Sequence, residues 1–171
     1  MDRDWDAAID DFTKAIELDP KSLAALFQRA SAKAGKRDWE GAIADYNEAL
    51  RLNDRLAPVH HGRGAALASQ GHLDVALRDF NRAIELDPRD AIAYVSRANL
   101  RRSQRHFETA INDYDKAIEL AADTASAEWR YHRAASWIDL REYDLAIADL
   151  DYAVAAGYSP AYSLRGLCRM R

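Results

Sequence analysis

Apolar residues recur along this chain with the spacing of one helical face. In the segment 4–19 they are Ala8, Ile9, Phe12, Ala15 and Ile16. These positions follow i, i+1, i+4, i+7 and i+8, which is a single stripe of a 3.6-residue period. The segment ends at Asp19-Pro20, where proline cannot continue a helix and restricts the residue before it. We therefore expect an amphipathic helix over this segment.

The same pattern returns at a fixed interval. Trp5, Trp39, Leu73 and Phe107 are 34 residues apart, and Tyr143 follows after 36. Five copies predict helices near 4–19, 38–53, 72–87, 106–121 and 142–156. Other helical stretches lie between and after them, near 23–34, 58–69, 91–103, 127–140 and 159–170. We expect about ten helices, joined by short loops, and no strand.

Composition and charge exclude several classes of protein. The chain has 171 residues, 49% of them hydrophobic, and carries 24 basic against 28 acidic residues for a net charge of −4. It is too apolar for a disordered tail and too acidic for a strongly basic nucleic-acid binder. No apolar run approaches the roughly 18 residues of a membrane span. We expect no nucleic-acid partner and no membrane insertion.

The residues that could bind a metal or a cofactor have no matching motif. The single cysteine, Cys168, cannot form an internal disulfide, and the five histidines lack the paired spacing of a zinc site. His72 and His106 stand where other copies have Asp or Glu at a helix start, so we expect turn or cap roles for them. The sequence has no Gly-rich phosphate loop and no nucleophile elbow. We expect no enzyme activity, no metal and no cofactor.

The repeat resembles the tetratricopeptide repeat, whose signature is W-x2-L-G-x2-Y, then A-x3-F, then P, every 34 residues. The second half of the signature is matched closely. Its first alanine position holds Ala8, Ala42, Ala76, Ala110 and Ala146, and its aromatic position holds Phe12, Tyr46, Phe80 and Tyr114. The first half is matched poorly, because its tryptophan position holds Leu26, His60, Tyr94, Arg130 and Tyr162.

The resemblance implies an all-α fold, a right-handed α-solenoid or superhelix of antiparallel helix hairpins. The frame of the signature gives half a repeat, four full repeats and another half, in one array over 1–171. Because no single hairpin can bury its apolar face, neighbouring hairpins must stack. In this family the first helix of each pair lines the concave side.

One arginine and one aspartate recur in every copy and do not vary. The aspartates are Asp11, Asp45, Asp79, Asp113 and Asp149, and the arginines are Arg29, Arg63, Arg97, Arg133 and Arg165. Pairing each aspartate with the arginine that follows it leaves none unmatched, so we expect a buried structural ion-pair ladder between successive hairpins. Arginine suits such a place because its planar fork grips a carboxylate with two hydrogen bonds. Arginines that bind an acidic ligand are the alternative.

The concave wall is the expected binding surface. By helical phase and family resemblance it displays Phe27, Gln28, Ser31, His61, Val95, Ser96, Asn99, Arg102, Tyr131 and His132. Mixed aromatic and polar residues on a rigid groove suit an extended peptide or a partner helix. The alternative is that these residues merely pack against the neighbouring helix.

The expected function is therefore a non-catalytic protein–protein interaction scaffold that binds a peptide or protein segment in this groove. Two alternatives stay open. The chain is a self-associating structural segment of a longer array, forming a homo-oligomer through exposed terminal helices, or it is the recognition arm of a larger enzyme. A cytoplasmic location is expected if the chain is complete, and none is assigned if it is a fragment.

Overall fold

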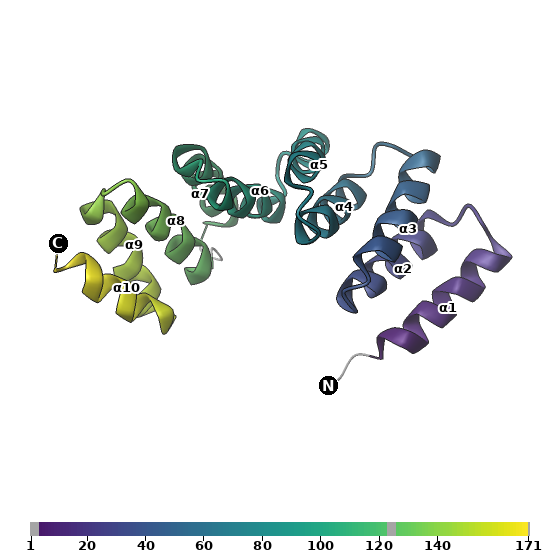
Figure 1. Ribbon diagram of the computed structural model, residues 1–171, viewed down its shortest axis with the longest axis horizontal. Helices are drawn as coiled ribbons and strands as arrows, with labels where there is room; N and C mark the ends of the chain where they lie inside the picture. The colour runs from purple at the N-terminus through teal and green to yellow at the C-terminus, as the bar shows by residue number, and fades with distance from the viewer. Residues whose placement is uncertain (1–3, 123–125, 171) are drawn as a thin grey trace. The chain divides into compact units, whose positions relative to one another are not determined.

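The chain folds into short helices joined by tight turns. The computed structural model describes residues 4–122 and 126–170, and within these ranges it contains ten α-helices and no strand (Figure 1). They are α1 (Trp5–Leu18), α2 (Leu23–Gly35), α3 (Trp39–Leu52), α4 (Ala57–Ser69), α5 (Leu73–Leu86), α6 (Ala91–Ser103), α7 (Phe107–Ala121), α8 (Ala127–Asp139), α9 (Tyr143–Ala155) and α10 (Pro160–Cys168). The predicted all-α fold is confirmed. Among the described helices, none combines the length and apolar character that crossing a bilayer requires.

The starts of the second helices depend on one column of residues. Asp4 and Asp38 each accept a hydrogen bond of 3.0 Å from the backbone amide three residues on, which caps α1 and α3. His72 and His106 precede α5 and α7 at the same position, and there the structure has no side-chain capping hydrogen bond. The two histidines thus occupy the expected N-cap positions, where their backbone carbonyls accept from Ala76 and Ala110, but their side chains do not cap the helices.

The turn inside each hairpin contains one residue in the left-handed backbone region. These residues are Arg37, Gly71, Arg105 and Arg141, with φ of 65°, 83°, 63° and 66°. The amide of the following residue then bonds back to the preceding helix, as Asp38 does to the carbonyl of Lys33 at 2.9 Å. Glycine adopts this conformation at the lowest cost. Three of the four turns nevertheless have arginine there, so the turn geometry is kept even where a side chain makes it less favourable.

The helices form two compact units, Met1–Pro88 and Arg89–Arg171. In the first unit, α1 packs against α2, and the hairpins α2–α3 and α4–α5 meet through α3 and α4. In the second unit, the hairpins α6–α7 and α8–α9 meet through α7 and α8, and α10 packs against α9. The order of elements within each unit follows the antiparallel alternation of first and second helices.

Buried alanines lie at the helix contacts in both units. Ala42 and Ala49 on α3 are 0% exposed, as are Ala110 and Ala117 on α7. A small side chain at these points lets two helices approach, and larger residues fill the space on either side. In the first unit, Leu26, Tyr46 and Val59 pack with Ala42 and Ala49. In the second unit, Tyr114 packs with Ala110 and Ala117, and Leu150 packs with Ala134 and Ala146.

Candidate functional site

An arginine–aspartate pair joins the middles of the two helices in each hairpin. Arg29 on α2 donates from Nε and Nη2 to the two carboxylate oxygens of Asp45 on α3, both at 2.8 Å. The same two-armed geometry joins Arg63 with Asp79, Arg97 with Asp113 and Arg133 with Asp149. The four aspartate side chains are only 5–7% exposed. These pairs are therefore buried parts of the hairpins.

The pairing predicted from the sequence is wrong, because it joined each aspartate to the arginine that follows it. Asp45 is paired with Arg29 of its own hairpin and not with Arg63 of the next. The antiparallel turn makes the first helix face the carboxylate, while the next hairpin meets α3 on an adjacent face. On that face Arg63 donates from Nη1 to Asn47, two residues after Asp45, at 2.8 Å. Successive hairpins are thus linked through the position of Asn47, and not through the aspartate column.

Pairing within hairpins leaves the end members of the two columns in different surroundings. Asp11 on α1 was expected to pair with Arg29, but its side chain is 79% exposed and lies 3.6 Å from Lys14. Arg165 on α10 was expected to pair with Asp149, but it donates from Nη1 to Asp151 at 2.7 Å. The contact with Asp151 is the counterpart of the Nη1 contacts of the other first helices. Neither end residue belongs to a two-armed pair within the described residues.

A second cation supports several of the buried carboxylates. Lys33 lies 2.8 Å from Asp45, and Arg101 lies 2.8 Å from Asp113. Burial lowers the pKa of Arg101, against the opposing attraction of Asp113. An acidic ligand would have to displace carboxylates that already occupy these cations. The geometry therefore favours the structural role of the two columns.

The predicted groove residues of the first unit lie on α2 and α4. The ring of Phe27 packs on Tyr46 with centroids 6.1 Å apart, and the hydroxyl of Ser31 lies 3.3 Å from the Tyr46 hydroxyl. The imidazole of His61 packs on the ring of Phe80 from α5, with centroids 5.8 Å apart. Gln28 is exposed. Phe27 and Ser31 are thus brought together around Tyr46, and Gln28 stands beside them at the surface.

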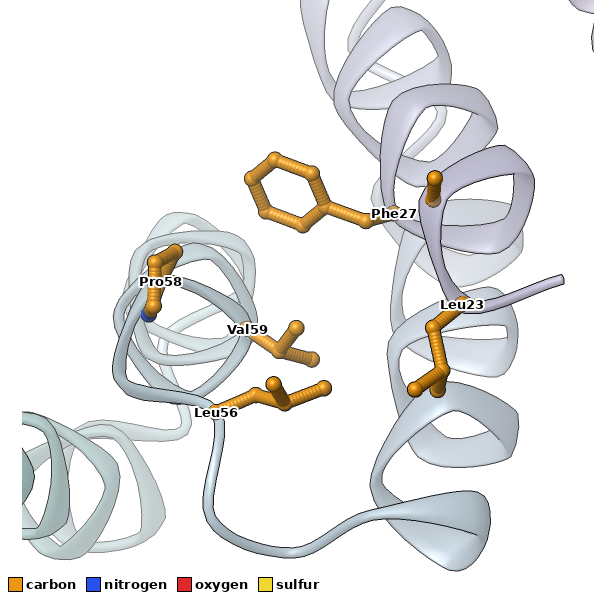
Figure 2. Close-up of a pocket in the computed structure, with 6 residues that line it drawn as sticks. Leu23, Phe27, Leu56, Pro58 and Val59 are labelled. Carbon is orange, nitrogen blue, oxygen red and sulfur yellow. The ribbon is translucent and has the colours of Figure 1, made fainter.

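A pocket of about 210 Å³ opens beside Phe27, between the N-terminal ends of α2 and α4. Six apolar residues line it: Leu23, Ala24, Phe27, Leu56, Pro58 and Val59. In Figure 2, Leu56 and Val59 point from the start of α4 toward Leu23 on α2, and the ring of Phe27 reaches across toward Pro58. We name this feature the Phe27 pocket.

The sequence prediction missed most of the Phe27 pocket. Of its six lining residues, only Phe27 was among the predicted groove residues. A signal was present in the chain. Leu23 stands four residues before Phe27, and the apolar run from Leu56 to Val59 spans the start of the next first helix. A spacing of four residues puts two side chains on one face of a helix, but it does not show that the neighbouring helix leaves space between them.

The predicted groove residues of the second unit converge on Tyr114, which α7 supplies. Its hydroxyl donates to Oδ1 of Asn99 at 2.6 Å, and its ring stacks on the imidazole of His132 with centroids 6.5 Å apart. Tyr131 lies edge-on to His132 at 5.4 Å and packs on Tyr158 at 5.3 Å. We name these five residues the Tyr114 cluster. Tyr114 and Tyr158 were not among the predicted groove residues.

Burial displaces three pKa values in the Tyr114 cluster, and raises that of Tyr158. Burial raises the pKa of Tyr114 to about 12, against the opposing effect of Arg102. Burial lowers the pKa of His132 below 6.5, and the charge of Arg102 lowers it further, while Glu128 at 3.6 Å acts in the opposite direction. At neutral pH the cluster therefore presents a neutral phenol and a neutral imidazole beside a guanidinium. Within the described residues, Nε of Arg102 and Nδ1 of His132 are buried without a hydrogen-bond partner.

The remaining predicted groove residues of the second unit differ in exposure. Val95 is only 8% exposed and packs with Ala98 and Tyr114 in the core. Its expected place on the open surface is therefore wrong, because α7 covers that face of α6. Ser96 is half-buried, and Asn99 is exposed.

Profiles of the tetratricopeptide repeat match most of the chain. One matches residues 2–58 and 95–161, and a second matches residues 57–90. The chain belongs to the tetratricopeptide repeat (TPR) family. No curated protein matches the sequence.

Solved structures of other TPR proteins share the fold. The crystal structure of MamA has a TM-score of 0.82 and 20% identity, and the match covers 93% of this chain and 92% of that one. YrrB, described as a TPR protein with an unusual peptide-binding site, has a TM-score of 0.79 and 19% identity over 92% of this chain and 81% of that one. A chain of the APC/C hetero-tetramer Cut9–Hcn1 has a TM-score of 0.81 and 20% identity over 98% of this chain and 33% of that one. At these identities the likeness shows the fold.

The ionisable residues of this TPR array gather by column and not around a centre. Among residues 4–122 and 126–170, no three His, Cys, Asp or Glu side chains lie close enough together to hold a metal ion. The one cysteine, Cys168, is buried on α10, and burial raises the pKa of its thiol. Phe27 of the pocket and His132 of the Tyr114 cluster occupy positions whose residues differ from one copy of the repeat to the next.

Proposed function

We propose that this TPR chain is a non-catalytic interaction scaffold that binds an extended peptide segment of another protein, with one apolar side chain of that segment in the Phe27 pocket. The observation that carries the proposal is the pocket itself, which is apolar on every side and is formed by two successive first helices. Two further observations support it. TPR proteins bind proteins or peptides, and the neighbour YrrB is described as having a peptide-binding site.

The size and lining of the Phe27 pocket favour a side chain over a small molecule. Small-molecule sites usually enclose roughly 300–1,000 Å³ and contain polar groups that orient the ligand. This pocket has about 210 Å³ and no polar residue in its wall. Burial of one aliphatic or aromatic side chain there contributes about 1.5–3 kcal/mol. In this proposal Gln28, which is exposed on the same helix, hydrogen-bonds the peptide backbone.

The proposal is tested by selecting binders from a displayed library of random peptides and measuring their affinities by isothermal titration calorimetry. Ala24 is exposed and lines the pocket, so Ala24→Trp fills the space without removing core contacts. We expect the selected peptides to share one apolar residue, and we expect their binding to be lost in Ala24→Trp. Replacing that apolar residue of the peptide by aspartate abolishes binding to the unaltered chain.

The matched control is Val75→Ala, at a 38% exposed apolar position on α5. It changes surface hydrophobicity without touching the pocket and leaves the affinity unchanged. Phe27→Ala enlarges the pocket and weakens binding, but because Phe27 also packs on Tyr46 its fold is checked by circular dichroism. Full affinity of the selected peptides for Ala24→Trp would refute the proposed site.

A further inference from the structure

The two end members of the ion-pair columns are complementary to each other. In the four hairpins, a first-helix arginine grips a second-helix aspartate with Nε and Nη2, as Arg29 grips Asp45. Arg165 is the first-helix arginine of α10, and in the described structure its hydrogen bond is the one from Nη1 to Asp151. Asp11 is the second-helix aspartate of α1 and is 79% exposed. Within the described residues, neither Arg165 nor Asp11 therefore makes the two-armed pair that joins the helices of each hairpin.

The open face of α10 is the face with which the other first helices bind their second helices. Gly166 stands in the column of Ala30, Ala98 and Ala134, all 0% exposed. A Cβ added at Gly64, the other glycine of this column, would lie 3.0 Å from the ring of Phe80. At Gly166 nothing lies within 4 Å of that position. The space that an aromatic residue fills in a hairpin is thus empty on α10.

Tyr162 shows the same difference at a second position of α10. It is 54% exposed, whereas Leu26 and His60 at the matching positions of α2 and α4 are 2% and 8% exposed. The open surface of α10 therefore extends over more than one turn, from Tyr162 to Gly166.

Helix α1 has the counterpart surface. Phe12 and Ala15 are partly exposed, whereas Tyr46 and Ala49 at the matching positions of α3 are 3% and 0% exposed. No residue of α1 is fully buried. The side of α1 that would face a first helix therefore carries an aromatic ring, a small residue and the carboxylate of Asp11.

We propose that α10 of one copy packs against α1 of a second copy as α2 packs against α3, so that Arg165 pairs with Asp11 of the second copy. Phe12 of the second copy then fills the space above Gly166. Arg169, which donates from Nη2 to Asp151 at 3.1 Å, adds a second positive charge one turn after Arg165, as Lys33 does beside Asp45. Because the two surfaces are different, the contact is head-to-tail and generates rings or open chains.

Charge reversal provides the first test, read as molar mass by light scattering at increasing concentration. The unaltered chain forms species larger than the monomer. Asp11→Arg and Arg165→Asp each place like charges at the contact, so each alone stays monomeric. An equimolar mixture of the two variants assembles again, because every contact in an alternating chain then joins opposite charges.

Gly166 provides a second test that does not change charge. Gly166→Ala introduces the residue that three hairpins already have and leaves assembly intact. Gly166→Leu occupies the space meant for Phe12 and gives monomers, while its circular dichroism stays that of the unaltered chain. The control Arg51→Asp, which reverses an exposed charge paired with Glu48 on α3, assembles normally.

Three results would overturn the inference: an unaltered chain that stays monomeric at every concentration, a mixture of the two charge variants that does not assemble, or normal assembly of Gly166→Leu. The pocket variant Ala24→Trp assembles like the unaltered chain. A failure of peptide binding is therefore distinguishable from a failure of self-association.

Discussion

Arg63 and Asp79 are joined by two hydrogen bonds, from Nε to Oδ2 at 2.8 Å and from Nη2 to Oδ1 at 2.6 Å. Nδ1 of His60 lies 3.3 Å from the same carboxylate, and the Asp79 side chain is 5% exposed. Loss of one partner from such a pair leaves the other charge buried without compensation, which costs more than the pair contributes. The aspartate column is thus a sensitive point of the hairpin.

We therefore expect Asp79→Ala to lower the free energy of unfolding by about 3 kcal/mol, as breaking a buried pair does. Asp11→Ala alters the same column at a 79% exposed side chain, and its effect stays below about 1 kcal/mol, the range of surface pairs. Urea denaturation of both variants, at concentrations where the chain is monomeric, measures the difference. Equal losses in the two variants would contradict the structural role assigned to the buried pair.

Replacement of glycine by alanine is expected to have opposite effects on stability at positions 62 and 166. A Cβ at Gly62 would lie 2.6 Å from the hydroxyl oxygen of the buried Tyr46, whereas a Cβ at Gly166 meets nothing. Alanine gains about 1 kcal/mol over glycine in a helix, and overpacking a core costs about 1–3 kcal/mol. Gly166→Ala is expected to stabilise the monomer and Gly62→Ala to destabilise it, as measured by urea denaturation.

The Gly62 prediction has an internal control in Tyr46→Leu. This change removes both atoms nearest to the new Cβ, the hydroxyl oxygen at 2.6 Å and Cζ at 2.7 Å, so Gly62→Ala should cost less in that background than in the unaltered chain. If Gly62→Ala stabilises the chain as much as Gly166→Ala does, the close approach of Tyr46 to α4 is not what excludes a side chain there.

Stability at alkaline pH should depend on Tyr114. Its pKa is raised to about 12 in the fold by burial, from 10.0 for the ordinary side chain. Between these values the unfolded chain releases the phenol proton and the folded chain retains it, so the free energy of unfolding falls as pH rises. The contribution of the Tyr114 phenol to the free energy of unfolding is complete below pH 10 and is lost as pH rises toward 12.

Urea denaturation at about pH 9 and about pH 11 measures this dependence. We expect the unaltered chain to lose more stability between the two than Tyr114→Phe, which has no proton to release there. Tyr114→Phe also loses the hydrogen bond to Asn99, which costs about 1 kcal/mol at both pH values. An identical pH dependence in the two proteins would show that Tyr114 is not buried as described.

The pKa of His132 should respond to the charges on both sides of it. Burial and Arg102 lower this pKa below 6.5, and Glu128 opposes them. Arg102→Gln is therefore expected to raise the pKa of His132, and Glu128→Gln to lower it further, as measured by an NMR titration of the imidazole ring protons. The exposed Arg141 provides a control, because Arg141→Gln should leave the titration unchanged.

The sign of the stability effect of His132 follows from the direction of its shift. A depressed pKa means that the folded chain holds this proton less strongly than the unfolded chain, so the contribution is present above pH 6.5 and is lost as pH falls through the lowered pKa. If the pKa of His132 does not change in Arg102→Gln, the two side chains are not close neighbours in solution.

Much of the fold could be predicted because it rests on local and nearest-neighbour patterns. The column of Trp5 and Trp39 set the repeat length, and the alanine columns marked the helix contacts. In a repeat protein each unit buries its apolar face against its neighbours, so the periodic pattern carries the main packing information. The predicted and observed helix ends agree to within two residues. The largest difference, two residues, is at the C-terminal end of α10.

The candidate site was predicted less completely. Helical phase placed both Phe27 and Val95 on the groove surface, but Phe27 is partly buried, and Val95 is only 8% exposed because α7 covers it. Phase gives the direction in which a side chain leaves its own helix. It does not show how far the neighbouring helix extends over that side chain, nor that Tyr114 would gather residues from three segments around it.

The sequence alone determined the repeat length, the ten helices and the two charged columns that run through the copies. The tertiary structure alone decided which arginine each aspartate binds. Asp45 has Arg29 sixteen residues before it and Arg63 eighteen residues after it, and antiparallel packing puts both at the same height. The choice depends on which face of α3 each neighbouring helix covers, and only the packed structure contains that information. Within the described residues the same packing sets Asp11 3.6 Å from Lys14 and joins Arg165 to Asp151.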